Sequence, residues 1–160
     1  MSVDHHHRAE ASGTIDLGVG HCRKLALPVM GDARGSLIAL EEGGALPTIA
    51  RVYYIYGTNS GASRGFHAHR LLQQLAVCVA GSCTIVVDDG IDRADVRLDR
   101  PDMGLAISPM IWREMHDFSP DCVLMVLASR PYEPADYIWD YGEFVRLAHP
   151  NQASPREISL

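Results

Sequence analysis

Short runs of apolar or alternating residues recur along most of the chain, and they predict a protein built almost entirely of β-strands. Turn signals separate these runs, as in EGG, TNSGAS, AGS, DDG and RPDMG. Many short strands spaced in this way favour a sandwich or barrel over a sheet that alternates with helices. We expect strands at 36–41, 51–57, 65–69, 74–80, 83–88, 94–98, 104–108 and 122–129.

The C-terminal stretch 133–148 differs from the rest of the chain. Its apolar residues Ile138, Tyr141, Val145 and Ala148 recur near helical spacing, which predicts a short helix there. Gly142 is a weak point within this helix, because glycine lowers helix propensity. We expect the helix to pack against the strands or to join two subunits rather than to form a site.

The two ends of the chain are polar and predict no core of their own. We expect a disordered leader over residues 1–20, which include the histidine run at 5–7, and a flexible tail over 149–160. Residues 21–148 then form one domain, which is long enough to bury a substantial core.

Composition and charge exclude several functional classes. A net charge of −6 argues against a nucleic-acid binder, which needs a basic face. No apolar run approaches the roughly 18 residues of a membrane span, and the N-terminus lacks the apolar segment of a signal peptide. No strand opens on a glycine-rich phosphate loop. We therefore expect a cytoplasmic protein without a dinucleotide-binding fold or membrane partner.

The four cysteines show no spacing typical of a zinc site. Cys78, Cys83 and Cys122 lie within apolar runs, and Cys22 stands alone. We expect all four to be buried free thiols in a reducing compartment.

The segment SRGFHAHR carries the strongest chemical signal of the chain. On a strand, His67 and His69 share one face with Cα atoms roughly 6.5–7 Å apart. Metal-binding cupins usually add a glutamate a few residues later and a third histidine from a later strand. Here those positions hold Gln73 or Gln74 and Arg113, and a permanent cation repels a divalent metal. We therefore expect no metal.

Without a metal, the pair suits proton transfer near neutral pH. An unperturbed imidazole titrates near 6.5, so it can accept and return a proton. The alternative is that both histidines only pack in the core or at its rim.

At this point the chain resembles the dTDP-sugar 3,4-ketoisomerases of the cupin superfamily, which include WxcM-like proteins and are related in fold to the dTDP-sugar 3,5-epimerases. The resemblance covers roughly residues 22–148. It rests on DARGSLIALE, RVYYIYG, RGFHAH, AGSCTIVVDDG, GLAISPMIWREMHDFSPDCVLMVLAS and DYIWDYGEF, in that order. The family often has Trp-His-Glu where this chain has Trp-Arg-Glu at 112–114.

The resemblance implies an all-β cupin jelly-roll barrel with a short C-terminal helix, assembled as a homodimer. It also implies the conversion of dTDP-4-keto-6-deoxy-D-glucose to a 3-keto-6-deoxyhexose through an enediolate. That reaction moves a ketone between adjacent carbons without net electron transfer and needs no cofactor. The product serves the synthesis of deoxyamino sugars for surface polysaccharides and related molecules.

The family's paired histidines map onto His67 and His69, and its preceding arginine maps onto Arg64. We expect one histidine to act as base and the other as proton shuttle, in an order that the sequence leaves open. Arg64 and Tyr54 are the candidates for stabilising the enediolate. Tyr54 could equally pack in the core, and Tyr53 points to the opposite face of the strand.

The substrate's diphosphate requires fixed cations. Arg34 and Arg51 are candidates, although each could simply be solvated or salt-bridged. Gly35 would allow a close backbone approach, or it could mark a plain turn. We further expect Gln74, Arg113 and Glu114 to contact substrate. Glu114 could instead orient a histidine or form an ion pair, and the nearby His116 is expected to be structural.

Three other functions remain open. The chain could be a metal-dependent cupin oxygenase or isomerase, a non-catalytic sugar-binding cupin, or a 3,5-epimerase. No residue of the sequence decides the stereochemistry at C4 or the identity of the nucleotide.

Overall fold

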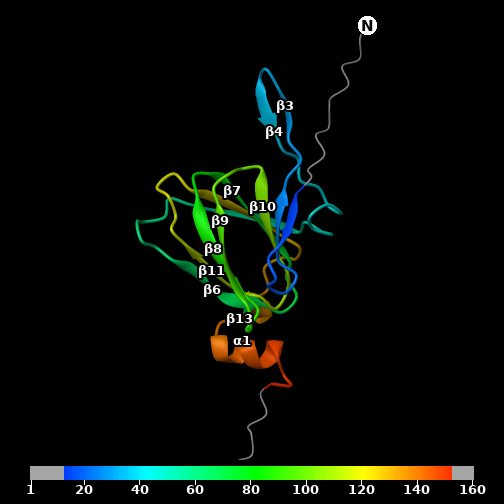
Figure 1. Ribbon diagram of the computed structural model, residues 1–160, viewed down its shortest axis with the longest axis vertical. Helices are drawn as coiled ribbons and strands as arrows, with labels where there is room; N and C mark the ends of the chain where they lie inside the picture. The colour runs from blue at the N-terminus through cyan, green and yellow to red at the C-terminus, as the bar shows by residue number, and fades with distance from the viewer. Residues whose placement is uncertain (1–12, 153–160) are drawn as a thin grey trace, which may run out of the picture.

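The strands form a two-layer sandwich, shown in Figure 1, with a small hairpin projecting from one end and a helix closing the other. The computed structural model describes residues 13–152. The six-stranded sheet has the order β1 (Thr14–Asp16), β2 (Arg23–Ala26), β10 (Met103–Ile107), β7 (Gln74–Ala80), β12 (Val123–Ala128) and β5 (Arg51–Tyr56). The second sheet has the order β13 (Tyr137–Ile138), β6 (Arg64–His69), β11 (Trp112–His116), β8 (Cys83–Asp88) and β9 (Arg93–Leu98).

The mainly β composition with one short helix is confirmed, and two expected strands, 74–80 and 83–88, match β7 and β8 in full. The two sheets are not closed into the barrel that the resemblance implied. Each sheet keeps its own hydrogen-bonded ladder, and apolar side chains fill the space between the layers. The architecture is therefore an open jelly-roll sandwich.

The hairpin of β3 (Met30–Asp32) and β4 (Gly35–Leu37) pairs only with itself. The expected strand 36–41 consequently ends at Leu37. Figure 1 shows the hairpin at the end of the molecule farthest from the helix.

Part of the expected leader, residues 1–20, belongs to the folded domain. Strand β1 pairs with β2, and Val19 in the following turn is buried in the core. The pairing satisfies the backbone hydrogen-bonding groups of this polar segment, which the pattern of side chains could not reveal. The rest of the leader, including the histidines at 5–7, lies outside the described residues, as does the tail beyond residue 152.

The C-terminal helix is half as long as its apolar spacing predicted. A 3-10 turn (Pro134–Asp136) and the short strand β13 come first, and α1 spans Tyr141–Ala148. Asp140 caps α1 by accepting a hydrogen bond from the amide of Glu143 at 2.7 Å. The helix buries Phe144 beside Trp112, which fixes α1 against the second sheet.

A β-bulge between β6 and β11 sets the direction of the histidine strand. The pairing shifts between Arg113 and Glu114, and both Gly65 (φ +89°) and Phe66 (φ +56°) have left-handed backbone angles. The extra residue breaks the simple alternation. Arg64 and His67, three residues apart, therefore line the same cavity.

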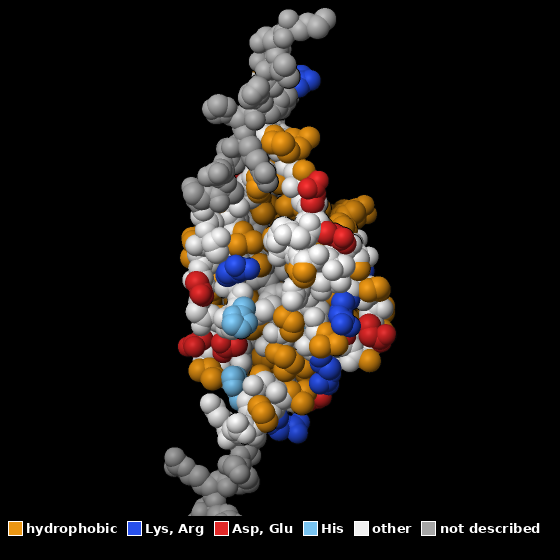
Figure 2. Space-filling view, turned by 90° about the vertical axis from the view of Figure 1, so that its right-hand side faces the viewer, with side chains coloured by type: hydrophobic (Ala, Val, Ile, Leu, Met, Phe, Trp, Pro, Cys, Tyr) orange, Lys and Arg blue, Asp and Glu red, His pale blue; other side chains and the backbone are white. Residues whose placement is uncertain are grey.

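The surface carries both signs of charge. Figure 2 shows apolar side chains on this face interspersed with separate acidic and basic groups rather than a continuous basic field. Among residues 13–152, no helix is long and apolar enough to cross a membrane.

We expect Gly65→Ala to lower the free energy of unfolding more than Gly57→Ala. Both glycines have positive φ, but a Cβ at Gly65 would meet the carbonyl oxygen of Arg113 at 2.9 Å, whereas Gly57 has open space. The shared backbone strain costs each variant of order 1 kcal/mol, and the clash adds a further cost at Gly65 alone. Urea unfolding of both variants measures the difference, and equal losses would contradict the steric role of the bulge.

Candidate active site

A cavity of about 570 Å³ opens beside the histidine strand, between β5, β6, β11 and β13. Its walls come from both sheets and from the segment that precedes α1. The side chains that matter for chemistry are Arg51, Tyr53, Arg64, His67, Tyr137 and Trp139. The bulge turns β6 so that His67 reaches this space, and His69 lies directly behind it at 1% exposure.

The two imidazoles and Asp136 form a hydrogen-bonded chain. Nε2 of His67 lies 3.2 Å from Nε2 of His69, and Nδ1 of His69 lies 3.0 Å from a carboxylate oxygen of Asp136. The carboxylate also accepts a hydrogen bond from the amide of Leu71 at 2.8 Å, which fixes its orientation.

This pattern assigns the protons of the neutral pair. The carboxylate of Asp136 accepts, so His69 carries its proton on Nδ1 and accepts a hydrogen bond at Nε2. His67 then donates from its own Nε2, which leaves its Nδ1 as a bare acceptor. That nitrogen is buried and has no partner among the described residues. It is the one ring nitrogen of the pair without a hydrogen-bond partner in residues 13–152, which makes it the candidate proton acceptor.

Both histidines are held neutral. Burial, followed by the positive charge of Arg113, lowers the pKa of His67 from 6.5 to about 4. Burial, Arg113 and then His67 lower the pKa of His69 to about 2. The pair therefore enters the reaction uncharged at neutral pH, with a base available at His67.

Arg113 is fully buried between the sheets. Its guanidinium donates to the side-chain oxygen of Gln74 and, at 2.7 Å, to the carbonyl oxygen of Ile111. Burial lowers its pKa to about 10, so it stays charged at neutral pH. A permanent cation at this depth opposes the binding of a divalent metal by the two histidines.

Gln74 connects Arg113 to the cavity wall. Its amide nitrogen donates to the hydroxyl of Tyr53 at 3.1 Å. The Tyr53 hydroxyl therefore accepts from Gln74 and keeps its own proton for a bound molecule. Burial raises the pKa of Tyr53, which keeps this donor protonated.

Two aromatic rings form a flat wall beside the histidines. Tyr137 and Trp139 stack with ring centroids 4.9 Å apart and planes 10° apart. Tyr137 contacts the ring of His69, and Trp139 contacts that of His67. Trp139 is 65% exposed, so most of its ring remains available for stacking on a flat ligand.

Two arginines supply positive charge at the cavity. Arg51 lies over the rings of Tyr53 and Tyr132, and its buried Nε has no hydrogen-bond partner among the described residues. Arg64 reaches the cavity from the bulge. An unsatisfied guanidinium donor beside a second arginine suits a phosphate group.

The structure corrects two of the residues predicted from sequence. Tyr54 is 64% exposed on the outer face of β5, because Arg51, Tyr53 and Ile55 take the inward positions of that strand. Glu114 also faces outward and accepts hydrogen bonds from Trp112 and Arg93.

Two further predicted residues lie apart from the histidines in the described chain, and their role in substrate binding stays a prediction. The β3–β4 hairpin carries Arg34 and Gly35 away from the histidine cavity, because it projects beyond the end of the sandwich (Figure 1). Arg34 pairs with Asp32 in the same hairpin. The expected structural role of His116 fits its contacts, since it bonds Ser63 and Glu114 at 2.9 Å each on the outer face.

Sequence reasoning missed Asp136, Tyr53, Tyr137 and Trp139. The segment Asp136-Tyr137-Ile138-Trp139 was included in the expected helix, yet its apolar residues also fit a strand. Ile138 is buried, while its two aromatic neighbours face the cavity. That alternation was the available signal for a strand. Asp136 had no comparable signal, because 67 residues separate it from His69.

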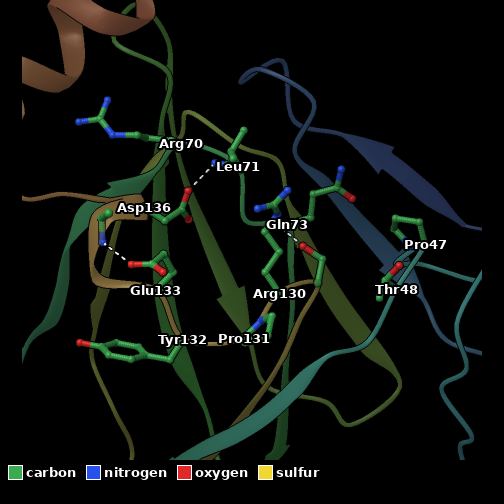
Figure 3. A pocket seen from close by; sticks show the side chains of 12 residues that line it. Pro47, Thr48, Arg70, Leu71, Gln73, Arg130, Pro131, Tyr132, Glu133 and Asp136 are labelled. Carbon is green, nitrogen blue, oxygen red and sulfur yellow. Dashed lines mark hydrogen bonds between the residues drawn. The ribbon is translucent and has the colours of Figure 1, made fainter.

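Asp136 also lines a second cavity of about 770 Å³, which Figure 3 shows. Its wall includes Arg70, Arg130, Tyr132 and Glu133. Figure 3 shows the Leu71 amide donating to Asp136. The amide of Ala135 donates to Glu133 at 3.1 Å. This cavity is the larger, but neither imidazole lines it, so we place the chemistry in the cavity at His67.

Comparisons with known proteins identify the family. The family model described as "FdtA: WxcM-like, C-terminal" matches residues 20–149. A TDP-4-oxo-6-deoxy-alpha-D-glucose-3,4-oxoisomerase of Aneurinibacillus thermoaerophilus is 52% identical over 114 residues, which cover 71% of this chain and 82% of that protein.

Two crystal structures of ketoisomerases share the fold. The 3,4-ketoisomerase of Helicobacter canadensis is 44% identical, with a TM-score of 0.77 over 80% of this chain and 97% of that one. The 3,4-ketoisomerase QdtA of Thermoanaerobacterium thermosaccharolyticum is 34% identical, with a TM-score of 0.78 over 83% and 97% of the chains. It was crystallised as a histidine-to-asparagine variant with TDP-4-keto-6-deoxyglucose.

The family match spans most of the chain, and the oxoisomerase shares more than half of the aligned residues. The chain therefore belongs to the WxcM-like family of dTDP-sugar 3,4-ketoisomerases, and it is an isomerase.

Proposed function

We propose that this protein converts dTDP-4-keto-6-deoxy-D-glucose to the 3-keto sugar through an enediolate, without a metal ion. The observation that carries the proposal is the free Nδ1 of His67, buried at the cavity and backed by His69 and Asp136. The related QdtA was crystallised with this 4-keto sugar, and we propose it as the substrate here.

The reaction needs one base, one returned proton and a stabilised oxyanion. His67 takes the proton from C3, and the electron pair of the C3–H bond forms the C3=C4 bond of the enediolate. The charge that develops on the C4 oxygen is stabilised by Arg64 and by the free proton of Tyr53. The proton of the C3 hydroxyl then moves to the C4 oxygen, the histidine pair returns a proton to C4, and the electron pair of the C3=C4 bond takes it up, which leaves the ketone at C3.

The chain behind His67 makes the proton return possible. Protonated His67 can pass its Nε2 proton to His69, because the two nitrogens are 3.2 Å apart. The Asp136 carboxylate then stabilises the positive charge on His69 and preserves the orientation of its ring. His67 is thus the base, and His69 is the shuttle.

The rest of the cavity fits a nucleotide-linked sugar. Arg51 and Arg64 provide the positive charge for a diphosphate, and the exposed ring of Trp139 provides a surface for a base or sugar. Phosphate groups prefer the bidentate geometry of arginine. This arrangement supports the expected sugar nucleotide as substrate.

We also propose that the protein works as a homodimer in the cytoplasm, in a pathway that makes deoxyamino sugars for surface polysaccharides. The outer face of β5 exposes Val52, Tyr54 and Tyr56, which together form an apolar surface on a strand at the sheet edge. The self-paired β3–β4 hairpin extends beyond the sandwich, where it could contact a second subunit.

The histidine assignment is tested in D₂O with chelator-treated protein and dTDP-4-keto-6-deoxyglucose, followed by proton NMR. We expect a 3-keto product with deuterium at C4. His67→Asn and His69→Asn should each lower turnover by about 100-fold or more, because general acid–base catalysis contributes that much. Tyr54→Phe, on the outer face, should retain the rate.

Other results of this assay would contradict the proposal. Exchange at C3 and C5 with the ketone still at C4 would identify a 3,5-epimerase. Activity that chelator abolishes and a metal restores would identify a metal-dependent cupin. Binding of the sugar without exchange at any carbon would identify a non-catalytic cupin.

Asp136→Asn tests the orientation of His69. The amide cannot stabilise a positive His69, so we expect kcat to fall by about 100-fold or more while KM changes little. Glu143→Gln, which removes a partly exposed ion pair with Arg70, is the matched control and should retain the rate. A change confined to KM would place Asp136 in substrate binding instead.

The lowered histidine pKa values also predict how stability depends on pH. Between pH 6.5 and about 4, the unfolded chain binds more protons at His67 than the folded chain does, and His69 extends this range to about 2. The free energy of unfolding should therefore fall as pH falls below 6.5, by up to about 1.4 kcal/mol per pH unit for each histidine.

Urea unfolding at pH 7 and pH 5 measures this dependence. His67→Asn and His69→Asn should each reduce the loss between the two pH values, while substitution of the exposed His21 should not. If neither variant reduced the loss, the two histidines would not be held neutral by the fold.

A further inference from the structure

Three cysteine side chains from separate segments meet inside the sandwich. Cys78 lies on β7, Cys83 begins β8, and Cys122 directly precedes β12. Their sulfur atoms all lie within 4.8 Å of one another, and those of Cys78 and Cys122 are 3.5 Å apart. All three residues are buried, and the proposed isomerase chemistry uses none of them.

The cluster is distant from the catalytic cavity. Cys78 follows Gln74 by four residues on the same strand, which corresponds to about 13 Å along β7. The 80–82 turn and the 119–122 turn cover the cluster, joined by hydrogen bonds between Ser82 and Ser119 at 2.8 and 2.9 Å. A ligand could therefore enter by local opening of two surface turns, without disturbing the histidines.

The donor set defines the class of ligand. Three sulfur atoms favour a soft metal ion over calcium, magnesium or manganese, which prefer oxygen. Structural zinc is almost always bound by four ligands, and the described residues supply no imidazole or carboxylate to this cluster. Cu(I) is soft and accepts three sulfur ligands. We propose that Cys78, Cys83 and Cys122 bind one Cu(I) ion.

Binding exchanges protons for the metal and involves no redox step. Each thiol that coordinates as a thiolate releases its proton, and the copper remains Cu(I) throughout.

The site would connect the two layers of the sandwich. Cys78 lies on β7 and Cys122 directly precedes β12, two strands of the six-stranded sheet, whereas Cys83 lies on β8 of the second sheet. An ion that binds the folded chain and not the unfolded one stabilises the fold. Copper should therefore raise the unfolding temperature without changing the isomerase rate.

The test titrates the full-length protein with Cu(I) under anaerobic conditions, in the presence of a phosphine reductant and the competing chelator bicinchoninate. We expect one Cu(I) per chain by native mass spectrometry, three sulfur neighbours by X-ray absorption, and a higher unfolding temperature. We expect each of three single variants to weaken Cu(I) binding by at least about tenfold: Cys78→Ser, Cys83→Ser and Cys122→Ser. Replacing a residue that only contacts a metal ligand already lowers metal affinity by that much.

Cys22→Ser is the matched control, because Cys22 is also buried but lies outside the cluster. This variant should bind Cu(I) as the parent protein does. Circular dichroism of every variant separates loss of ligand from loss of fold. Binding that persists in the Cys78→Ser/Cys83→Ser/Cys122→Ser variant would assign the copper to other groups, including the N-terminal histidines, and overturn the proposal. Failure of the parent protein to compete with bicinchoninate would do the same.

Discussion

The buried guanidinium of Arg113 is the constraint on which the active site depends. A charge without compensation in a protein interior costs several kcal/mol, so its hydrogen bonds to Gln74 and to the carbonyl oxygen of Ile111 must be maintained. These contacts fix the spacing of β7 and β11 at the level of the histidines. Through Gln74 they also hold the hydroxyl of Tyr53 at the cavity wall.

Burial and, after it, the same charge set the protonation of the two histidines. Both imidazoles are neutral as a result, and the charge of Arg113 opposes the binding of a divalent metal by them. A neutral pair of imidazoles can transfer a proton only if each proton sits on the right ring nitrogen. Asp136, in the segment before α1, sets these positions by accepting the hydrogen bond from Nδ1 of His69. The proposed base His67 and shuttle His69 thus depend on two groups from distant parts of the chain, the buried cation of Arg113 and the carboxylate of Asp136.

The β-bulge at Gly65 and Phe66 contributes the second constraint. It inserts one residue into β6, so that Arg64 and His67 line one cavity despite their odd spacing. A regular strand would turn Arg64 to the opposite face. The charge that the proposed enediolate requires is therefore positioned by backbone geometry rather than by the alternation of side chains.

The sequence by itself determined the strands, the adjacent histidines, the buried cysteines and the family, because each depends on local periodicity or on motifs in a fixed order. It could not determine which face of a strand points inward, so Tyr54 was chosen over Tyr53 and Glu114 was placed at the site. Only the tertiary structure placed Asp136 beside His69, placed the three cysteines together and placed Arg34 apart from the histidine cavity. These outcomes depend on how the strands pair across long stretches of chain, and local side-chain patterns contain little information about that pairing.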